Sequence, residues 1–318
     1  MKPEAMNILD KYYMEPSTLS DLRSTFGDHL QENVPLSSYT AARIGGPADV
    51  IIIAYSADEL AALADRLWKL NVTFILLGGG SNVLVSDKGI RGVVIINRAR
   101  QVKFDSQAEP PIVQAESGVT PHDITQRAAR LGLAGFEWAA SLPGSLGGAI
   151  YGNAGAFGGD IAGNLISLEL VHREKGHQVW PVGKMEYGYR TSVLKRDHPP
   201  VVILSAKLAL SHGEAQAIRT KMDQFSEQRR KNQPPGASMG SMFKNPAGDK
   251  AGRLIEAAGL KGRRMGSAEI SNQHANYFIN HGQTRAEDMK ALIDLAKNTV
   301  AEKFGITLEL EVELIGEW

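Results

Sequence analysis

The segment "VTFILLGGGSNVLV" at residues 72–85 joins an apolar run to three consecutive glycines and then to a second apolar run. Glycines at this density are typical of a backbone that approaches another group closely, and that group is often a phosphate. Neither common phosphate motif is present. G-x-G-x-x-G requires a glycine where Val83 stands, and the chain lacks the Gly-Lys-Ser/Thr of a P-loop. Because the second apolar run predicts a strand rather than a helix, the remaining prediction is a nest of backbone N–H groups, with a tight turn as its alternative.

The residues before this segment predict a strand and a helix. "ADVIIIAY" at 48–55 is typical of a buried strand. In the following stretch, 56–70, Ser56 and Glu59 have the spacing of a capping box, and leucines recur at helical spacing. The glycines therefore follow the second strand of a predicted βαβ unit. Sheets of this kind bind ligands at the carboxyl ends of their strands, which supports a binding loop.

A second glycine-rich segment, "SLPGSLGGAIYGNAGAFGGD" at 141–160, contains seven glycines. That number is too high for the interior of a helix or strand, so the sequence predicts a loop. The segment is not the Gly-x-Ser-x-Gly elbow of a hydrolase, because Pro143 stands where that motif needs a glycine before Ser145. Two such loops favour a dinucleotide with its pyrophosphate between them.

Strand and helix patterns continue along the rest of the chain. We expect strands at 82–96 (with a turn at Lys88–Gly89), 111–117, 165–171, 200–210 and 306–315. We expect helices from Thr120 to Gly132, at 214–231, at 251–260, and at 285–305 with Thr284 and Glu287 as a capping box and Gly305 as terminator. Residues 1–40 lack clear periodicity and predict an arm. The pattern is mixed α/β or α+β, and a length of 318 residues favours two or three lobes.

Composition excludes several classes of protein. Thirty-five basic and 35 acidic residues give zero net charge, which argues against a nucleic-acid binder. The absence of cysteine excludes disulfides, thiolate metal sites and iron–sulfur clusters, and the eight histidines show no metal-ligand spacing, so we expect no metal. No apolar run approaches the ~20 residues that span a bilayer, and the N-terminus lacks a signal-peptide pattern. We therefore expect a cytoplasmic protein without membrane insertion.

Three further segments contain residues suited to chemistry. In "YGYRTS" at 187–192, an arginine among aromatic and hydroxyl groups suits a carboxylate or a developing enolate, although a surface arginine over tyrosines is the alternative. "GSMFKNP" at 240–246 combines a hydroxyl, an ammonium and an amide, or forms an ordinary turn. The last strand places Glu309, Glu311 and Glu313 on one face, and periodicity does not distinguish among them.

These segments occur together with others in one order. The quoted motifs are "ARIGGPAD", "LGGGSNVLV", "AASLPGSLGGAIYGNAGAFGGDI", "YGYRTSVLK", "GSMFKNP", "AGRLIEAAGLKG" and "EVELIGE". Their order resembles the UDP-N-acetylenolpyruvoylglucosamine reductase (UDP-N-acetylmuramate dehydrogenase) family, from about residue 34 to the C-terminus. Each motif alone is weak, but the ordered set is highly specific.

The resemblance implies a fold and an activity. The fold is α+β: an FAD-binding fold of the vanillyl-alcohol oxidase/PCMH type in two subdomains (41–97 and 98–212) after the arm (1–40), plus a separate α/β substrate-binding domain (213–318). FAD is bound noncovalently, and NADPH reduces the flavin. Flavin N5 then passes hydride to the enolpyruvyl ether of the UDP-sugar, and a serine supplies the proton. The product is UDP-N-acetylmuramate, a precursor of peptidoglycan.

The resemblance also implies site residues. The family's catalytic arginine, serine and glutamate correspond to Arg190, Ser241 and Glu311. Tyr189, Lys244 and Asn245 would bind substrate. FAD would be held by the two glycine-rich loops, at Gly78, Gly79, Gly80, Ser81 and Asn82 and at Ser145, Gly147, Gly148, Asn153 and Gly155. The basic stretch 228–231, which includes Arg229 and Arg230, is predicted as surface; the resemblance leaves a contact with the cofactor open, and the stretch is not among the predicted site residues.

One departure and two alternatives accompany the resemblance. Only "SHGE" links Leu210 to the next helix, so the chain is similar to the shorter subgroup, which lacks an extra loop with a substrate-closing tyrosine. His274 stands near a substrate-contacting position of some members. A different flavin oxidoreductase, such as an oxidase, is one alternative function. A sugar-nucleotide binding protein without flavin is the other.

Overall fold

The computed structural model describes residues 16–318 and divides into two compact units. The first unit comprises the described part of Met1–Ile53, with Arg66–Ile96 and Pro234–Trp318. The second unit comprises Ala54–Asp65 and Asn97–Gln233. Each unit is therefore built from segments that are distant in the sequence. Residues 1–15 of the predicted N-terminal arm lie outside the described residues, and the predicted domain boundaries at 41, 98 and 213 stay predictions.

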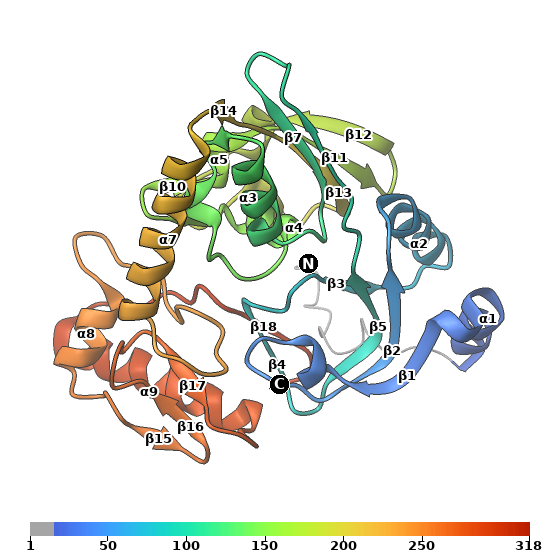
Figure 1. Ribbon diagram of the computed structural model, residues 1–318. Coiled ribbons are helices and arrows are strands. Elements are labelled where there is room, and N and C mark those ends of the chain that lie inside the picture. The colour runs from blue at the N-terminus through green and yellow to red at the C-terminus, as the bar shows by residue number, and fades with distance from the viewer. Residues whose placement is uncertain (1–15) are drawn as a thin grey trace, which may run out of the picture. The chain divides into compact units, whose positions relative to one another are not determined.

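The N-terminal part of the first unit contains a four-stranded sheet of order β1-β2-β5-β3 (Figure 1). Its strands are β1 (Leu30–Pro35), β2 (Pro47–Ala54), β5 (Ile90–Asn97) and β3 (Phe74–Leu77). β1 and β2 are antiparallel, whereas β3 and β5 are parallel. The apolar runs become strands because their alternate side chains are buried in one core, which includes Leu36, Ile51 and Val94. The helix α1 (Pro16–Phe26) and the 3₁₀ turns η2 (Gly27–His29) and η3 (Leu36–Tyr39) flank β1 in the sequence.

The helix of the predicted βαβ unit is α2 (Ala57–Lys69). The Glu59 N–H donates to the Ser56 hydroxyl at 3.1 Å, and the Glu59 carboxylate accepts from the Tyr55 N–H at 2.7 Å. The predicted N-cap at Ser56 is therefore confirmed, whereas the Glu59 carboxylate bonds to the N–H of the residue before the cap. The glycine segment leads into another strand, β4 (Val83–Val85), which confirms that no helix follows it.

The C-terminal part of the first unit has its own core. Two helices, α8 (Ala251–Ala257) and α9 (Ala286–Phe304), accompany a small sheet of order β15-β16-β17 (Arg264–Met265, Ala268–Ile270 and Phe278–Asn280). Phe243, Phe278 and Leu292 are buried in this core. The final strand, β18 (Glu313–Ile315), runs parallel to β4 and pairs Glu313 with Val83. This pairing joins the chain's end to the glycine loop.

The second unit is organised around an antiparallel sheet of order β12-β11-β13-β7-β6 (Figure 1). Its strands are Gly176–Pro181, Leu165–His172, Val201–Ala209, Ile112–Glu116 and Val102–Asp105. The core includes Phe136, Leu168 and Leu208. α3 (Pro121–Arg130) begins at Thr120, whose hydroxyl accepts from the Asp123 N–H at 3.1 Å, as predicted. α7 (Ala215–Asn232) supplies the second long helix.

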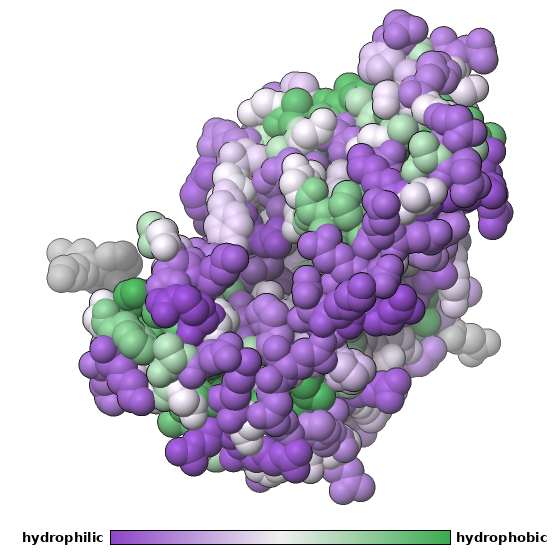
Figure 2. Space-filling model, turned by 60° about the vertical axis from the view of Figure 1, so that its left-hand side comes forward, coloured by the Kyte–Doolittle hydropathy of each residue, from purple (hydrophilic) through white to green (hydrophobic). Residues whose placement is uncertain are grey.

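Short elements complete the second unit. They are β8 (Leu133–Ala134), η4 (Glu137–Ala139), β9 (Gly155–Ala156), β10 (Gly159–Asp160), α5 (Ile161–Asn164), η5 (Val182–Met185), α6 (Val193–Asp197) and β14 (Ser211–His212). The space-filling view shows a mostly hydrophilic face on which hydrophobic residues form small, separate groups (Figure 2). In the described part of the chain, no helix combines the length and hydropathy needed to cross a membrane.

Three expectations from the sequence are wrong in detail. The glycine-rich segment contains a seven-residue helix, α4 (Leu146–Gly152). It forms despite its glycines because the Ser145 hydroxyl caps the Gly148 N–H at 3.3 Å, and because Asn153 ends it in the left-handed conformation with φ of 46°. Leu146 and Ile150 are both fully buried.

The other two corrections concern the C-terminal region. α9 begins after Arg285 rather than at Thr284, because the Asp87 carboxylate accepts from the Ala286 and Glu287 N–H groups at 2.8 and 3.0 Å. The predicted last strand at 306–315 is continuous only from Glu313. Before it the chain bends at residues 311–312, because its peptide groups bond to the 241–244 segment instead of to a sheet.

Candidate active site

In the first unit, the motif containing Ser241 lies between two other segments. On one side Ser241 bridges to Tyr277, and the Met242 N–H donates to the Asn276 carbonyl at 2.8 Å. On the other side the Glu311 N–H donates to the Met242 carbonyl at 3.0 Å. Residues from three distant parts of the sequence are thus adjacent. The two predicted proton-handling residues, Ser241 and Glu311, lie on hydrogen-bonded neighbouring segments.

The three glutamates that the sequence left equivalent have different surroundings. Glu309 is exposed and forms an ion pair with Lys244. Glu313 lies in β18, where its N–H donates to the Asn82 carbonyl at 3.0 Å. Glu311 is half-buried in the bend, with its N–H on Met242 and its carbonyl accepting from the Asn82 side chain at 3.0 Å. Glu311 is therefore the one of the three whose N–H bonds to the segment that contains Ser241.

The first glycine loop is built onto this arrangement. Gly80 has φ of +57°, and its carbonyl accepts from the Ala41 N–H at 2.9 Å. A Cβ at Gly80 would lie 2.1 Å from the Tyr39 carbonyl oxygen, so both conformation and space require glycine. Gly79 is exposed, and Ser81 and Asn82 are half-buried. The Asn82 amide is directed to the Glu311 backbone, although the sequence assigned it to cofactor binding.

In the second unit, the second glycine segment holds the turn that contains Arg190. The Tyr187 hydroxyl donates to the Ile150 carbonyl at 2.9 Å, and the Ser192 hydroxyl donates to the Tyr151 carbonyl at 2.6 Å. The Asn153 amide donates to the Gly188 carbonyl at 3.1 Å. Burial, together with the Asp160 charge, raises the pKa of Tyr187, so its hydroxyl stays a donor.

Arg190 occupies a strained position in this turn. Its φ is 55°, a left-handed conformation that is uncommon for a non-glycine residue. Its Nη2 donates to the Gly155 carbonyl at 3.0 Å, and its guanidinium lies 5.6 Å from the centroid of the Tyr189 ring. Tyr189 is 57% exposed. The guanidinium is therefore held between the second glycine segment and the Tyr189 ring.

The predicted substrate residues Lys244 and Asn245 also have partners within the first unit. The Lys244 side chain is 17% exposed and pairs with Glu309, while its N–H donates to the Glu309 carbonyl at 2.8 Å. The Asn245 Oδ1 accepts from the Ala251 N–H at 3.1 Å, at the start of α8. Asp249 is next to this start, and the Arg253 guanidinium lowers its pKa to about 2. The carboxylate therefore remains charged at the positive end of the helix.

Comparison with known proteins decides the family. Residues 48–180 match the model of an FAD binding domain, and residues 231–315 match that of the UDP-N-acetylenolpyruvoylglucosamine reductase C-terminal domain. The reductase of Chloroflexus aggregans is 43% identical over 289 residues, which are 90% of this chain and 97% of that protein. The chain belongs to the UDP-N-acetylenolpyruvoylglucosamine reductase family.

Two further members of the reductase family agree with this assignment. The Bacillus subtilis reductase is 40% identical over 286 residues, covering 89% of this chain and 93% of that protein. The crystal structure of the Thermus caldophilus reductase is 34% identical, with a TM-score of 0.75 over 88% of this chain and 97% of that one. The predicted family and α+β flavin-binding fold class are thus confirmed. Members of the family are FAD-binding oxidoreductases.

Each glycine loop has exposed backbone that a ligand can approach. Gly79 and Gly148 are exposed. A Cβ at Gly148 would meet only the Ser145 hydroxyl, at 3.6 Å, among the described residues, so a ligand can approach this backbone closely. Gly147 differs, because a Cβ there would lie 3.1 Å from that of Ser117 and its glycine serves internal packing. Backbone N–H and hydroxyl groups are suitable donors to a diphosphate.

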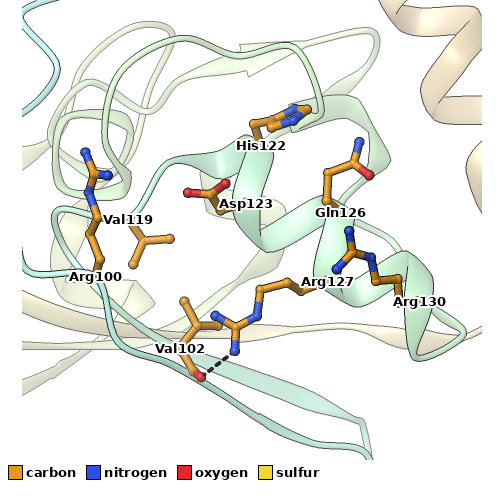
Figure 3. Close-up of a pocket in the computed structure, with 8 residues that line it drawn as sticks. All are labelled: Arg100, Val102, Val119, His122, Asp123, Gln126, Arg127 and Arg130. Atoms are coloured by element: carbon orange, nitrogen blue, oxygen red, sulfur yellow. Dashed lines mark hydrogen bonds between the residues drawn. The ribbon is translucent and has the colours of Figure 1, made fainter.

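One cavity, of about 460 Å³, lies wholly within the second unit (Figure 3). Arg127 and Arg130 project from α3 on one side, and Arg100 lies on the other. Arg127 is held by the Val102 carbonyl at 3.0 Å, and the Asp123 carboxylate offsets one positive charge. The guanidinium groups of Arg100 and Arg127 do not converge in the view, and none of the predicted reductase site residues lines this cavity.

Sequence reasoning missed Asn276, which is 3% exposed. Its side chain bonds to both the N–H and the carbonyl of Phe243. The motif "NQHAN" drew attention only to His274, and nothing in its polar pattern distinguishes a buried asparagine from an exposed one. His274 is half-buried, and its ring lies edge-on to Tyr277 at 5.0 Å between centroids. The basic stretch 228–231 forms the last turn of α7, and its side chains are mostly exposed.

Proposed function

We propose that the chain reduces the enolpyruvyl ether of UDP-N-acetylglucosamine enolpyruvate to UDP-N-acetylmuramate, in the synthesis of peptidoglycan precursors. FAD is the noncovalent cofactor, and NADPH is the reductant. The similarity to reductases of the family, which extends over nearly the whole length of those proteins, supports this activity. One observation carries the proton chemistry: Ser241 and Glu311, which are distant in the sequence, lie on segments joined by the bond from the Glu311 N–H to the Met242 carbonyl.

The reaction adds a hydride and a proton across the C=C bond of the enolpyruvyl group. When bound, FAD supplies the redox chemistry, because N5 can accept a hydride from NADPH and return one to the terminal vinyl carbon. Hydride addition conjugate to a carboxylate leaves an enolate. Ser241 donates its hydroxyl proton to the carbon next to the carboxylate, since an enolate carbon is basic enough to take it when the geometry is correct.

Two charged residues assist this proton transfer. The fixed, permanently charged fork of Arg190 stabilises the developing enolate by hydrogen bonding. Glu311 orients the proton donor or shares its proton, which requires a carboxylate with a fixed backbone, as observed. Lys244, Asn245 and Tyr189 bind the phosphate or carboxylate groups of the substrate. The Lys244–Glu309 ion pair must then open or be shared when a phosphate binds.

The FAD assignment extends to both glycine loops. In the first loop, Gly78, Gly79, Gly80 and Ser81 bring backbone N–H groups to the diphosphate. The second loop contributes Ser145, Gly148 and Gly155. Gly147 supports this loop, because its N–H donates to the Ser117 carbonyl at 2.7 Å and a Cβ there would crowd Ser117. Asn82 and Asn153 support these loops from within, because their amides bond to the Glu311 and Gly188 carbonyls respectively.

Optical titration of the purified protein tests this function. We expect a flavin spectrum that bleaches when NADPH is added anaerobically and returns when the enolpyruvyl UDP-sugar is added. Rapid steady-state oxidation of NADPH should require that sugar. Rapid turnover of a simple alcohol with oxygen would instead identify an oxidase. A colourless protein that does not take up FAD would indicate a sugar-nucleotide binding protein without flavin.

A further inference from the structure

The Asn276 side chain makes two hydrogen bonds to the backbone of the Ser241 motif, as a neighbouring strand would. Its Oδ1 accepts from the Phe243 N–H at 3.0 Å, and its Nδ2 donates to the Phe243 carbonyl at 2.8 Å. The main-chain carbonyl of the same residue accepts from the Met242 N–H at 2.8 Å. One residue thus satisfies three backbone groups in a row. The side chain is buried, so loss of either amide bond would leave a polar group without water.

One of these three bonds acts on a peptide group that also contacts Glu311. The peptide between Met242 and Phe243 donates its N–H to Asn276, and its carbonyl accepts from the Glu311 N–H at 3.0 Å. Met242 and Phe243 are 0% and 1% exposed, so their side chains anchor the segment in the core. Ser241 precedes this peptide and bridges to Tyr277. Asn276, the peptide and Glu311 therefore form a continuous hydrogen-bonded row.

We infer that Asn276 is a positioning residue for proton delivery. It fixes the peptide that sets Ser241 against the substrate and keeps Glu311 in register with that serine. This inference rests on the proposed function of both residues. Proton transfer is sensitive to small displacements of the donor, because a shift of about 1 Å can slow a reaction by about 10²-fold. An amide suits this position, because its oxygen accepts from the N–H and its NH2 group donates to the carbonyl of the same backbone residue.

The test separates the two half-reactions in rapid-mixing experiments. In Asn276→Ala and Asn276→Asp, NADPH should reduce the flavin at the wild-type rate. Reoxidation by the enolpyruvyl UDP-sugar should slow by about 10- to 100-fold. The solvent deuterium isotope effect on reoxidation should also rise, because proton transfer becomes limiting. Asn276→Asp preserves side-chain volume and the acceptor for Phe243, and it provides the measurement if the alanine variant does not fold.

Glu269→Gln is the matched control. Glu269 is 6% exposed in β16 and bonds to Arg264, Asn272 and His281, so its replacement disturbs the same small sheet without touching the Ser241 motif. It should lower the free energy of unfolding and leave the isotope effect unchanged. Equal losses in both half-reactions of the Asn276 variants, or slow reoxidation with an unchanged isotope effect, would overturn the positioning role. If wild-type flavin is not reoxidised by the sugar, the proposed function itself fails.

Discussion

The glutamates at positions 309, 311 and 313 have identical side chains but different surroundings in the fold. Alternation alone places them on one face, and that is all the sequence could predict. The three differ in the fold, because the Glu311 N–H bonds to Met242 in the bend, Glu309 pairs with Lys244, and Glu313 bonds to Asn82 in the final strand. Long-range backbone bonds of this kind leave no periodic trace in the sequence.

Replacement of Glu311 by glutamine should slow flavin reoxidation by about 100-fold, because the side chain loses its charge and its ability to share a proton. Glu309→Gln should change the rate by less than about fivefold, since an exposed ion pair contributes at most about 1 kcal/mol. Glu313→Gln tests the remaining position. Single-turnover kinetics measure all three variants. Similar losses in the three would show that the charge of the whole face matters and that Glu311 has no special role.

Removal of the Ser241 hydroxyl should separate the two half-reactions. Ser241→Ala should leave flavin reduction by NADPH intact and slow reoxidation by about 10²- to 10⁴-fold, the usual contribution of a general acid. The side chain is small and half-buried, so the fold should be retained. Stopped-flow absorbance of the flavin measures both rates. An equal loss in reduction and reoxidation would contradict a proton-donating role.

At the level of elements, the sequence predicts what local forces determine. The caps at Ser56 and Thr120 were found because capping uses neighbouring residues. α4 was missed because its glycines have low helix propensity, and only the burial of Leu146 and Ile150 with caps at both ends compensates. The final strand was predicted too long for the opposite reason: its alternating pattern is real, but the bonds of residues 309–311 go to the 242–244 segment.

The start of α9 provides a test of a long-range cap. Asp87→Ala should lower the free energy of unfolding by about 1 kcal/mol, since the Ala286 and Glu287 N–H groups lose their acceptor. Urea denaturation measures this change. Thr284→Val is the control, because within the described residues the buried Thr284 hydroxyl has no hydrogen-bond partner. If Thr284→Val lost as much stability as Asp87→Ala, Thr284 would be the helix cap, as the sequence predicts.

Within each unit of the molecule, a predicted catalytic residue is tied to a predicted cofactor loop. In the first unit Asn82, at the end of one glycine loop, bonds to the Glu311 carbonyl. In the second unit Arg190 bonds to the Gly155 carbonyl of the other loop. Each loop proposed to bind FAD is therefore joined by a direct hydrogen bond to a residue proposed to act on the substrate. The sequence predicts the loops and the charged residues. It does not predict these hydrogen bonds, because they join residues far apart in the chain: 82 with 311, and 155 with 190.

Stability of the folded chain should depend on pH through His274. Burial lowers the pKa of this side chain below its ordinary value of 6.5, the nearby Lys261 charge lowers it further, and a hydrogen bond and Glu256 oppose the shift. The ring nitrogen Nδ1 accepts from the Asn276 N–H at 3.2 Å, which requires the unprotonated atom. Below pH 6.5 the unfolded chain therefore binds a proton that the folded chain excludes, and the free energy of unfolding falls as the pH falls.

His274→Gln removes this titration and retains a polar side chain of similar size. Urea denaturation of the wild type and the variant at about pH 7.5 and at about pH 5.5 measures it. We expect the free energy of unfolding to fall more in the wild type than in the variant between about pH 7.5 and about pH 5.5. Only the wild type has a histidine at this position that takes up a proton more readily in the unfolded chain than in the folded one. An identical pH dependence in the two proteins would show that the burial of His274 does not suppress its protonation.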